Sequence, residues 1–168
     1  MSSQTNVQDA PPHVVLRQAF SVFPTGVVAV CASVEGRPVG ISVNSFTSIS
    51  LDPPLVAVSV ARTSSTWPIL ADRPRLGLSV LGSHHEALCR RLSSRGVDRF
   101  EGAEWHQTEA GSVLIDGAAL WLECEVRATF DGGDHEIILL EVMATDVFPE
   151  VAPLVFHQSR FRGLRTAE

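Results

Sequence analysis

The residues from Leu120 to Val147 constrain the fold most, because they predict a long antiparallel β-hairpin. Apolar and polar side chains alternate from Leu120 to Phe130, which is the period of a strand with one buried face. Asp131-Gly132-Gly133-Asp134 then supplies residue types that tolerate the positive φ of a tight turn. The returning segment is apolar on both faces as far as Met143, so we expect a central strand or a subunit contact.

Shorter apolar segments elsewhere predict further strands of the same antiparallel type. Turn residues separate them and helices are few, so the spacing favours a closed sheet over alternating strands and helices. We therefore predict a mainly β fold, an antiparallel barrel of about seven strands with peripheral helices. The expected strands cover 27–30, 39–44, 55–60, 76–81, 120–130, 137–147 and 154–157, with Phe161 beyond the last.

Short helices are expected around this sheet. Apolar side chains recur at helical spacing from His13 to Val22 and Pro24 ends the pattern, so this helix should cover the sheet. A second helix should begin where Ser64-Ser65-Thr66 precedes Trp67-Pro68, and end near Asp72. A third helix is expected at 84–92, a surface loop at 93–109, a flexible tail at 1–12 and one domain at 13–165.

Composition excludes several classes of function. The 168 residues include 13 basic and 19 acidic ones, a formal charge of −6, and every basic residue is Arg. A binder of nucleic-acid phosphates needs a positive stripe, so no nucleic-acid partner is expected, and a catalytic Lys is excluded. The longest apolar runs fall short of the ~20 residues that cross a bilayer, so no membrane partner is expected.

The cysteines indicate a reducing compartment. Cys31, Cys89 and Cys124 are odd in number and lack C-x-x-C spacing, and the N-terminus lacks the regions of a signal peptide. We therefore expect a cytoplasmic protein. Because Cys31 lies inside an apolar run, its thiol should be buried and inert.

The first candidate site is the segment from Ser42 to Ser50, which contains five small hydroxyl side chains and the amide of Asn44. Such side chains, with the backbone N–H groups between them, can bind a polar heterocycle or a phosphate without formal charge. The alternative is a Ser/Thr-rich edge strand and its turn.

The second candidate is Arg62-Thr63-Ser64-Ser65-Thr66, at the start of the expected second helix. Free N–H groups there favour an anion, and Arg62 would add a bidentate cation, so a phosphate site is one interpretation. Simple capping of the helix is the other.

The third candidate is Gly133-Asp134-His135 at the hairpin tip, where His135 could offer a hydrogen bond to a ligand and Asp134 could orient it. The alternative is ordinary turn chemistry. We expect no metal site, because the adjacent His84 and His85 rarely face one ion and no second cluster supports them. The chain also has no G-x-S-x-G elbow for a hydrolase and no G-x-G-x-x-G for a dinucleotide fold.

Taken in order, these three motifs resemble those of the flavin reductase-like family, the small components that supply reduced flavin to two-component monooxygenases. The stretches Phe23 to Val27, Leu51 to Leu55 and Asp98 to Phe100 add to the resemblance, which covers about residues 13–165. It implies a split β-barrel of the FMN-binding type that works as a homodimer. It also implies FMN or FAD as the flavin, NADH or NADPH as co-substrate, and transient transfer of reduced flavin to a separate monooxygenase.

The resemblance also implies roles for particular residues. His135 would lie near the nicotinamide and orient its carboxamide or the pyrophosphate, as the single candidate in the catalytic role. Backbone N–H groups from Asn44 to Phe46 are expected to donate to the flavin edge where negative charge accumulates on reduction. The remaining cofactor contacts implied are Ser42, Asn44, Ser45, Phe46, Ser48 and Ser50 on one wall, Thr25, Gly26 and Val27 on the other, Arg62, Ser64 and Thr66 at the phosphate, and Asp98, Arg99 and Phe100 near the nicotinamide.

Two positions depart from the family pattern. Leu140 stands where a Gly is common, and Leu92 stands where a Phe is common. Two other functions fit the same barrel, namely a flavin-binding carrier without catalysis and a flavin-dependent oxidase. A reductase needs the two rings stacked about 3–3.5 Å apart and no strong acid, nucleophile or metal, which agrees with this sequence.

Overall fold

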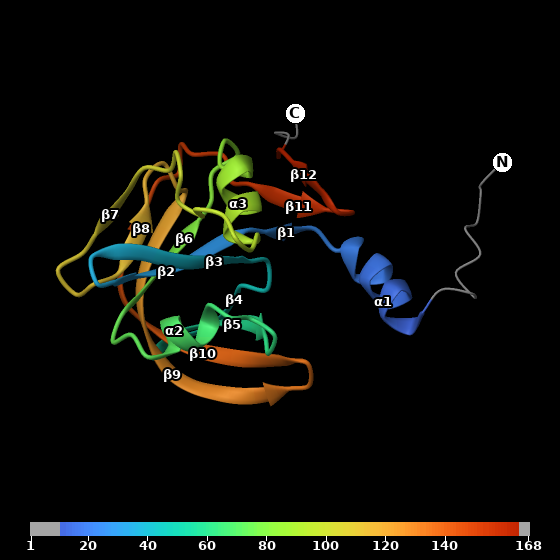
Figure 1. Cartoon of the computed structure of the whole chain (residues 1–168), viewed down its shortest axis with the longest axis horizontal. Helices are drawn as coiled ribbons and strands as arrows, with labels where there is room; N and C mark the ends of the chain where they lie inside the picture. Colours follow the sequence, from blue (N-terminus) through green and yellow to red (C-terminus); the bar gives the residue numbers. More distant parts are fainter. Residues whose placement is uncertain (1–10, 165–168) are drawn as a thin grey trace.

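The computed structural model describes residues 11–164, and a seven-stranded antiparallel sheet dominates it (Figure 1). Its strand order is β3-β2-β6-β9-β10-β5-β4, and two smaller antiparallel sheets, β1-β11-β12 and β7-β8, accompany it. The prediction of a mainly β, antiparallel fold with few helices is therefore confirmed. The elements are α1 (Pro12–Ser21), β1 (Thr25–Gly26), β2 (Val28–Val34), β3 (Arg37–Val43), β4 (Thr47–Leu51), β5 (Pro54–Ala61), α2 (Trp67–Ala71), β6 (Leu76–Val80), α3 (Glu86–Leu92), β7 (Trp105–Gln107), β8 (Val113–Ile115), β9 (Leu120–Gly132), β10 (His135–Val147), β11 (Val155–His157) and β12 (Arg160–Arg162).

Strands β9 and β10 form the long hairpin that the alternating segment predicts. Gly132 pairs with His135, so Gly133 and Asp134 make the turn, and Gly133 has a φ of +78° that favours glycine. Of the two alternatives for the return strand, the central position is found, because β10 is hydrogen-bonded to both β9 and β5. Leu140 is completely buried on it, so the larger side chain at this position belongs to the core.

Strand β2 lies between two hydrophobic clusters, because alternate side chains of a strand point to opposite faces. Val28 and Val30 belong to the first cluster, with buried side chains from β3, β5, β6, β9 and β10. Ala29 and Cys31 belong to the second, with β8 and α3. Strands from both halves of the seven-stranded sheet, β3 and β5 among them, contribute side chains to the first cluster. The sheet therefore curls around this cluster. The edge strands β3 and β4 do not pair with each other within residues 11–164, so the predicted closure of the sheet is not found.

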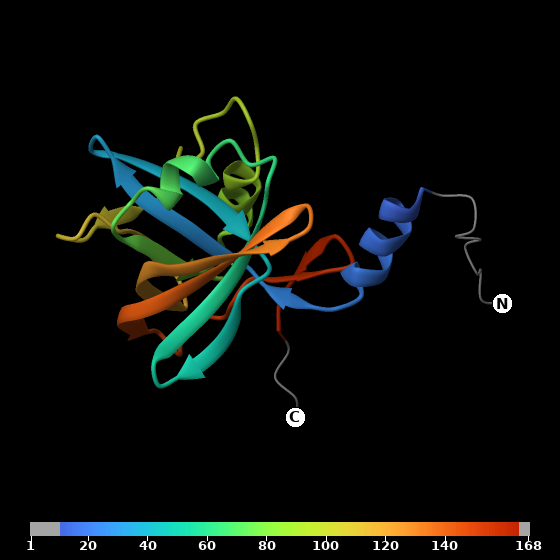
Figure 2. The ribbon, with the colours of Figure 1, turned by 90° about the horizontal axis from the view of Figure 1, so that it is seen from below.

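Helix α1 is where the prediction of a covering helix is wrong. Its bounds agree with the expectation to within one residue, but it has no buried residue and stands apart from the sheets (Figures 1 and 2). Leu16, Phe20 and Phe23 are exposed. The apolar period identified a helix face but not the surface that this face contacts. Pro11 is the N-cap and Pro12 the first residue of this helix rather than parts of a tail, and the rest of the expected tail, residues 1–10, lies outside the described part of the chain.

The expected surface loop at 93–109 is also partly wrong, because β7 lies inside it and pairs with β8. Phe100 on the same stretch is buried in the second cluster. The other two helices occur where they were predicted. No helix within residues 11–164 has the length and apolar character needed to cross a membrane.

Candidate functional site

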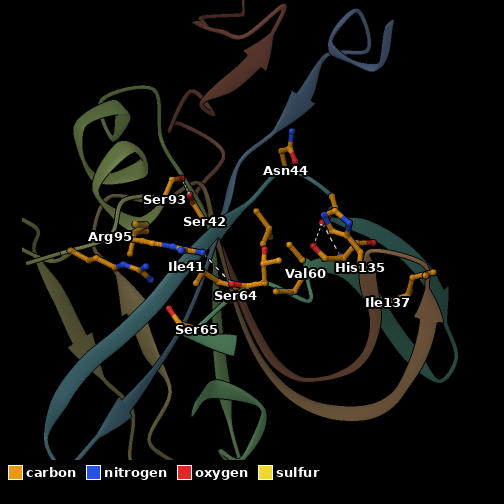
Figure 3. Close-up of a pocket in the computed structure, with 18 residues that line it drawn as sticks. Ile41, Ser42, Asn44, Val60, Ser64, Ser65, Ser93, Arg95, His135 and Ile137 are labelled. Carbon is orange, nitrogen blue, oxygen red and sulfur yellow. Dashed lines mark hydrogen bonds between the residues drawn. The ribbon is translucent and has the colours of Figure 1, made fainter. Parts of the chain in front are cut away.

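A cavity of about 630 Å³ opens where the end of β3, the tip of the β9–β10 hairpin and the segment before α2 meet (Figure 3). Arg95 and Ser93 lie on one side of it, His135 lies on the opposite side, and Ser64 and Ser65 lie between them (Figure 3). No carboxylate lines this cavity among the described residues, although the chain has a formal charge of −6. Hydroxyls and two arginines therefore make a local environment that favours an anionic ligand.

The cavity brings together residues from all three predicted motifs, which are far apart in the sequence. The antiparallel pairing of β5 with β10 places His135 opposite Ala61, directly before the second motif. The end of β3 supplies the first motif from the neighbouring wall. The predicted residues that line the cavity are Ser42, Asn44, Ser45, Ser64, Arg99 and His135.

Two of the serines are already held by hydrogen bonds within the fold. The Ser45 hydroxyl accepts a hydrogen bond from the Ser59 N–H at 2.8 Å and donates one to the Ser59 carbonyl at 2.9 Å. The Ser42 hydroxyl lies 2.6 Å from that of Ser93 and donates to the Cys89 carbonyl at 3.2 Å. These side chains therefore fix the cavity wall, joining the end of β3 to β5 and to α3.

The backbone of residues 44–46 is the part of this wall that is free to bind. These residues lie between β3 and β4, and none of their N–H groups donates a hydrogen bond to another described residue. The Asn44 side chain likewise makes no hydrogen bond within the described chain. Asn44 and Ser45 line the cavity, so successive unpaired donors here can bind a ligand that carries acceptors along one edge.

Asn44 also connects this cavity to two neighbouring ones. The second, of about 640 Å³, has Val27, Phe156 and Phe161 on its wall, and the third, of about 700 Å³, lies against α1 and includes Thr25. All three include Asn44, so the site has several arms that meet at the end of β3. Val27 and Thr25 thus lie beside this junction.

His135 is held by its sequence neighbour. Its Nδ1 lies 2.7 Å from an Asp134 carboxylate oxygen, and this hydrogen bond lowers the pKa of the Asp134 carboxyl. The His135 side chain is 45% exposed and lines both the first cavity and the one beside α1. With Nδ1 engaged, Nε2 is the ring atom left for a ligand.

Arg62 does not line the cavity. Its guanidinium donates to Asp131 at 2.8 Å, to Glu136 at 2.9 Å and to the Gly133 carbonyl at 2.9 Å. The hydrogen bond with Asp131 is the main reason that the pKa of Arg62 is raised. The predicted phosphate cation is therefore turned toward the hairpin.

Arg99 acts as a clamp within the cavity wall. It donates to the Ser94 carbonyl at 2.9 Å and, through one nitrogen, to the Gly40 carbonyl and the Thr66 hydroxyl at 2.8 Å each. These contacts hold the loop after α3 against β3 and α2. Asp98 lines a separate pocket of about 270 Å³ with Thr66, Arg99 and Phe100, and its carboxylate accepts from the Phe100 N–H.

Besides Arg62, four predicted residues lie outside the lining of these cavities. Phe46 packs against the first hydrophobic cluster, Ser48 and Ser50 lie on edge strand β4, and Gly26 lies on β1. Composition located the motif at 42–50 to which Phe46, Ser48 and Ser50 belong. Which of its side chains reach the cavity depends on how β4 pairs with β5. The sequence motif is thus longer than the part of it that reaches the cavity.

Sequence reasoning missed Arg95, although it is the second arginine on the cavity wall. Its guanidinium donates to the Thr63 carbonyl at 3.2 Å, beside Ser65. It lies in a stretch that was expected to be a surface loop, and the only signal was its place between Ser93-Ser94 and Gly96. Ser93 and Ser59 were missed for the same reason, since only the tertiary structure brings them to the cavity.

The cysteines offer no reactive thiol. All three are free and buried, and burial raises the pKa of each thiol, that of Cys124 to about 12. No group of three His, Cys, Asp or Glu side chains in the described part of the chain is arranged to hold a metal ion.

The fold and the site together define an antiparallel β protein with a cavity whose backbone donors, hydroxyls and arginines suit an anionic, acceptor-rich ligand. The chain belongs to the flavin reductase-like family, since the flavin reductase like domain matches residues 20–165. The predicted family and its class of activity, an oxidoreductase that reduces flavin, are confirmed by this match and by the relatives described next.

Relatives of high coverage carry the same kind of activity. The chain is 34% identical to a flavin reductase of Pseudomonas putida over 88% of this chain and 87% of that one. It is 37% identical to an NADH-dependent FAD reductase of Streptomyces globisporus over 92% and 87% of the two chains. The solved NADH:FAD oxidoreductase of Streptomyces globisporus C-1027, in complex with NAD and FAD fragments, superposes with a TM-score of 0.85, 38% identity and 93% coverage of both chains.

Proposed function

We propose that this protein transfers a hydride from NADH to FAD and supplies the reduced flavin to a partner monooxygenase. The observation that carries the proposal is the run of free backbone N–H groups at residues 44–46, beside a carboxylate-free cavity with Arg95. FAD and NADH are chosen over FMN and NADPH because of the Streptomyces globisporus relatives. The two connected cavities of about 630 and 640 Å³ agree with a flavin that has a second, adenylate arm.

The residues present fit a flavin. Its pyrimidine edge is rich in acceptors, which matches the donors at 44–46, and its phosphate matches Arg95. When both cofactors are bound, the nicotinamide supplies a hydride to the flavin ring. The chain's part is to bind and orient the two molecules, and free donors fixed by the fold stabilise negative charge on the flavin edge without reorganising.

Arg95, rather than Arg62, is the phosphate cation in this proposal. Arg95 lines the cavity beside Ser65 and makes one hydrogen bond to a carbonyl, so guanidinium donors remain for a phosphate. Arg62 is neutralised by two carboxylates instead.

His135 is the residue that contacts the nicotinamide nucleotide in this proposal. The carboxylate of Asp134 fixes its Nδ1, so Nε2 faces the ligand and can hold the carboxamide or the pyrophosphate. No proton transfer by His135 is required, because hydride transfer between the two cofactors needs none from it.

We propose that the fold is a split barrel and that two copies of the chain form a homodimer. Phe130 and Ile137 face each other on β9 and β10 and are exposed, and Met143 is exposed further along β10. Together with the unpacked apolar side chains of α1, they make an apolar surface of the kind found at subunit interfaces. Ile137 also lines the cavity, so the partner copy would border the site.

Transfer to a monooxygenase is supported by the kind of relatives that the chain has. One is the reductase subunit of a flavin-dependent monooxygenase of Rhodococcus jostii, 30% identical over 88% of this chain and 76% of that one. The three buried free thiols agree with the cytoplasmic location predicted from the sequence.

One assay tests the activity. Purified protein is mixed with NADH under anaerobic conditions, with FAD, FMN or no flavin, and absorbance of the nicotinamide is followed. Loss of NADH that depends on added flavin, fastest with FAD, is the expected result. Flavin binding without NADH consumption would support a carrier instead, and no response to any flavin would refute the proposal.

A further inference from the structure

Arg62 holds the turn of the β9–β10 hairpin by four hydrogen bonds. Besides the three guanidinium bonds to Asp131, Gly133 and Glu136, its own N–H donates to the Asp134 carbonyl at 3.0 Å. The Asp131 carboxylate is in turn held by the Gly133 N–H at 3.1 Å. Arg62, directly after β5, thus contacts a hairpin that lies 69, 71 and 74 positions further along the chain at the three guanidinium contacts.

The pattern of contacts divides the turn into two sides. Arg62 hydrogen-bonds to four of the six residues from 131 to 136, and the two it does not hydrogen-bond to are Gly132 and His135. Those two are the turn residues that line the cavity. Arg62 therefore contacts turn residues that do not line this cavity, while Gly132 and His135 form part of its wall and Asp134 lines the cavity beside α1.

Such a grip matters because the turn is exposed. The Asp131 and Asp134 side chains are 83% and 93% exposed. Single ion pairs on a surface are weak, but a guanidinium shared among two carboxylates and a carbonyl forms a network in one geometry.

We propose that Arg62 is a positioning residue that acts through His135, by fixing the hairpin turn so that the imidazole faces the bound nucleotide. The proposal rests on the proposed function insofar as His135 contacts the nicotinamide nucleotide. In this proposal Arg62 does not bind the flavin phosphate but supports binding of the nicotinamide nucleotide. Loss of Arg62 should change nucleotide use and leave flavin binding intact.

A double-mutant cycle tests this. Arg62→Ala should raise the KM for NADH about three- to tenfold in the presence of His135, and cause no further change in a His135→Ala background. Affinity for riboflavin, FMN and FAD should stay within twofold of wild type, as roughly expected where no contact is lost. Arg127→Ala is the matched control, since Arg127 lies on the same hairpin, pairs with Glu141 and does not line the cavity.

The cycle also separates positioning from charge. If Arg62 acted on the anionic nucleotide through space, its loss would weaken NADH binding equally with and without His135, and additive effects would overturn the proposal. A selective loss of affinity for phosphorylated flavins would overturn it in favour of a phosphate contact. Arg62→Lys, which cannot span all three acceptors, should restore only part of the wild-type KM.

Hydrogen exchange tests the grip without any assay of activity. Amides of the turn at 131–136 should exchange at least several-fold faster in Arg62→Ala than in wild type or Arg127→Ala, while the rest of β10 stays protected. Unchanged exchange would overturn the positioning role even if the enzyme is active. Faster exchange in a protein without NADH oxidation would uphold the grip and refute only the proposed function.

Discussion

Gly40 on β3 is a position where the structure allows no side chain. It pairs with Cys31 on β2, and the ring of Phe100 lies over it. A Cβ built at Gly40 would lie 2.5 Å from the Cys31 sulfur, 3.0 Å from Phe100 Cζ and 3.2 Å from the Val30 carbonyl oxygen. Gly40→Ala therefore forces either the thiol or the aromatic ring to move.

The expected cost follows from this overlap. Overpacking a close-packed core by one methyl group costs about 1–3 kcal/mol, which for a domain of this size lowers the unfolding temperature by about 3–10 °C. The change should be measured by calorimetry against Gly163→Ala, because a Cβ at Gly163 meets nothing within 4 Å. Arg99 donates to the Gly40 carbonyl, so the cavity wall should shift as well.

A second substitution shows whether the thiol is the obstacle. Cys31→Ala removes the closest atom, so the double variant of Gly40→Ala and Cys31→Ala should be less destabilised than the sum of the two single variants. Strict additivity would refute the packing argument, as would a Gly40→Ala variant that unfolds at the same temperature as Gly163→Ala.

Three further substitutions test other parts of the structure. Ser45→Ala removes the one side-chain partner that both backbone groups of Ser59 have within residues 11–164, and should lower the free energy of unfolding by about 1–3 kcal/mol in a denaturant titration; an unchanged value would contradict this role. Arg95→Ala should weaken FMN and FAD binding about tenfold in a fluorescence titration and riboflavin binding little, whereas equal losses would move the phosphate elsewhere. The hydrogen bond from Arg62 holds the pKa of Asp131 below its usual value near 3.8, so the ionised carboxylate stabilises the fold above that pH and loses this effect as pH falls through the lower, folded pKa. The difference in unfolding temperature between wild type and Asp131→Asn should therefore be constant near pH 7 and shrink as the pH falls below about 3.8, and a gap that does not shrink would contradict the linkage.

The strongest local sequence patterns were sufficient to predict the main strands and helices. The alternation through β9, the glycines of the turn and the apolar β10 are properties of adjacent residues, so they predicted the hairpin and, as one of two alternatives, the central place of its second strand. The three motifs were likewise visible in sequence, and the cavity gathers residues from each. Helix α1 was predicted to within one residue, because its apolar period is local.

The tertiary structure decided which residues, distant in the sequence, each side chain contacts. The Arg62 side chain could reach a phosphate or a hairpin, and only the pairing of β5 with β10 brings Asp131, Gly133 and Glu136 within hydrogen-bond distance. The same holds for Arg95, which reaches the cavity because Arg99 ties its loop to β3. Residue type and spacing record what a side chain can do, whereas the register of distant strands determines which neighbours it meets. The sequence by itself therefore determined the hairpin, the longer strands and the chemical character of the site, and the folded chain decided which arginine lines the cavity and which one holds its wall.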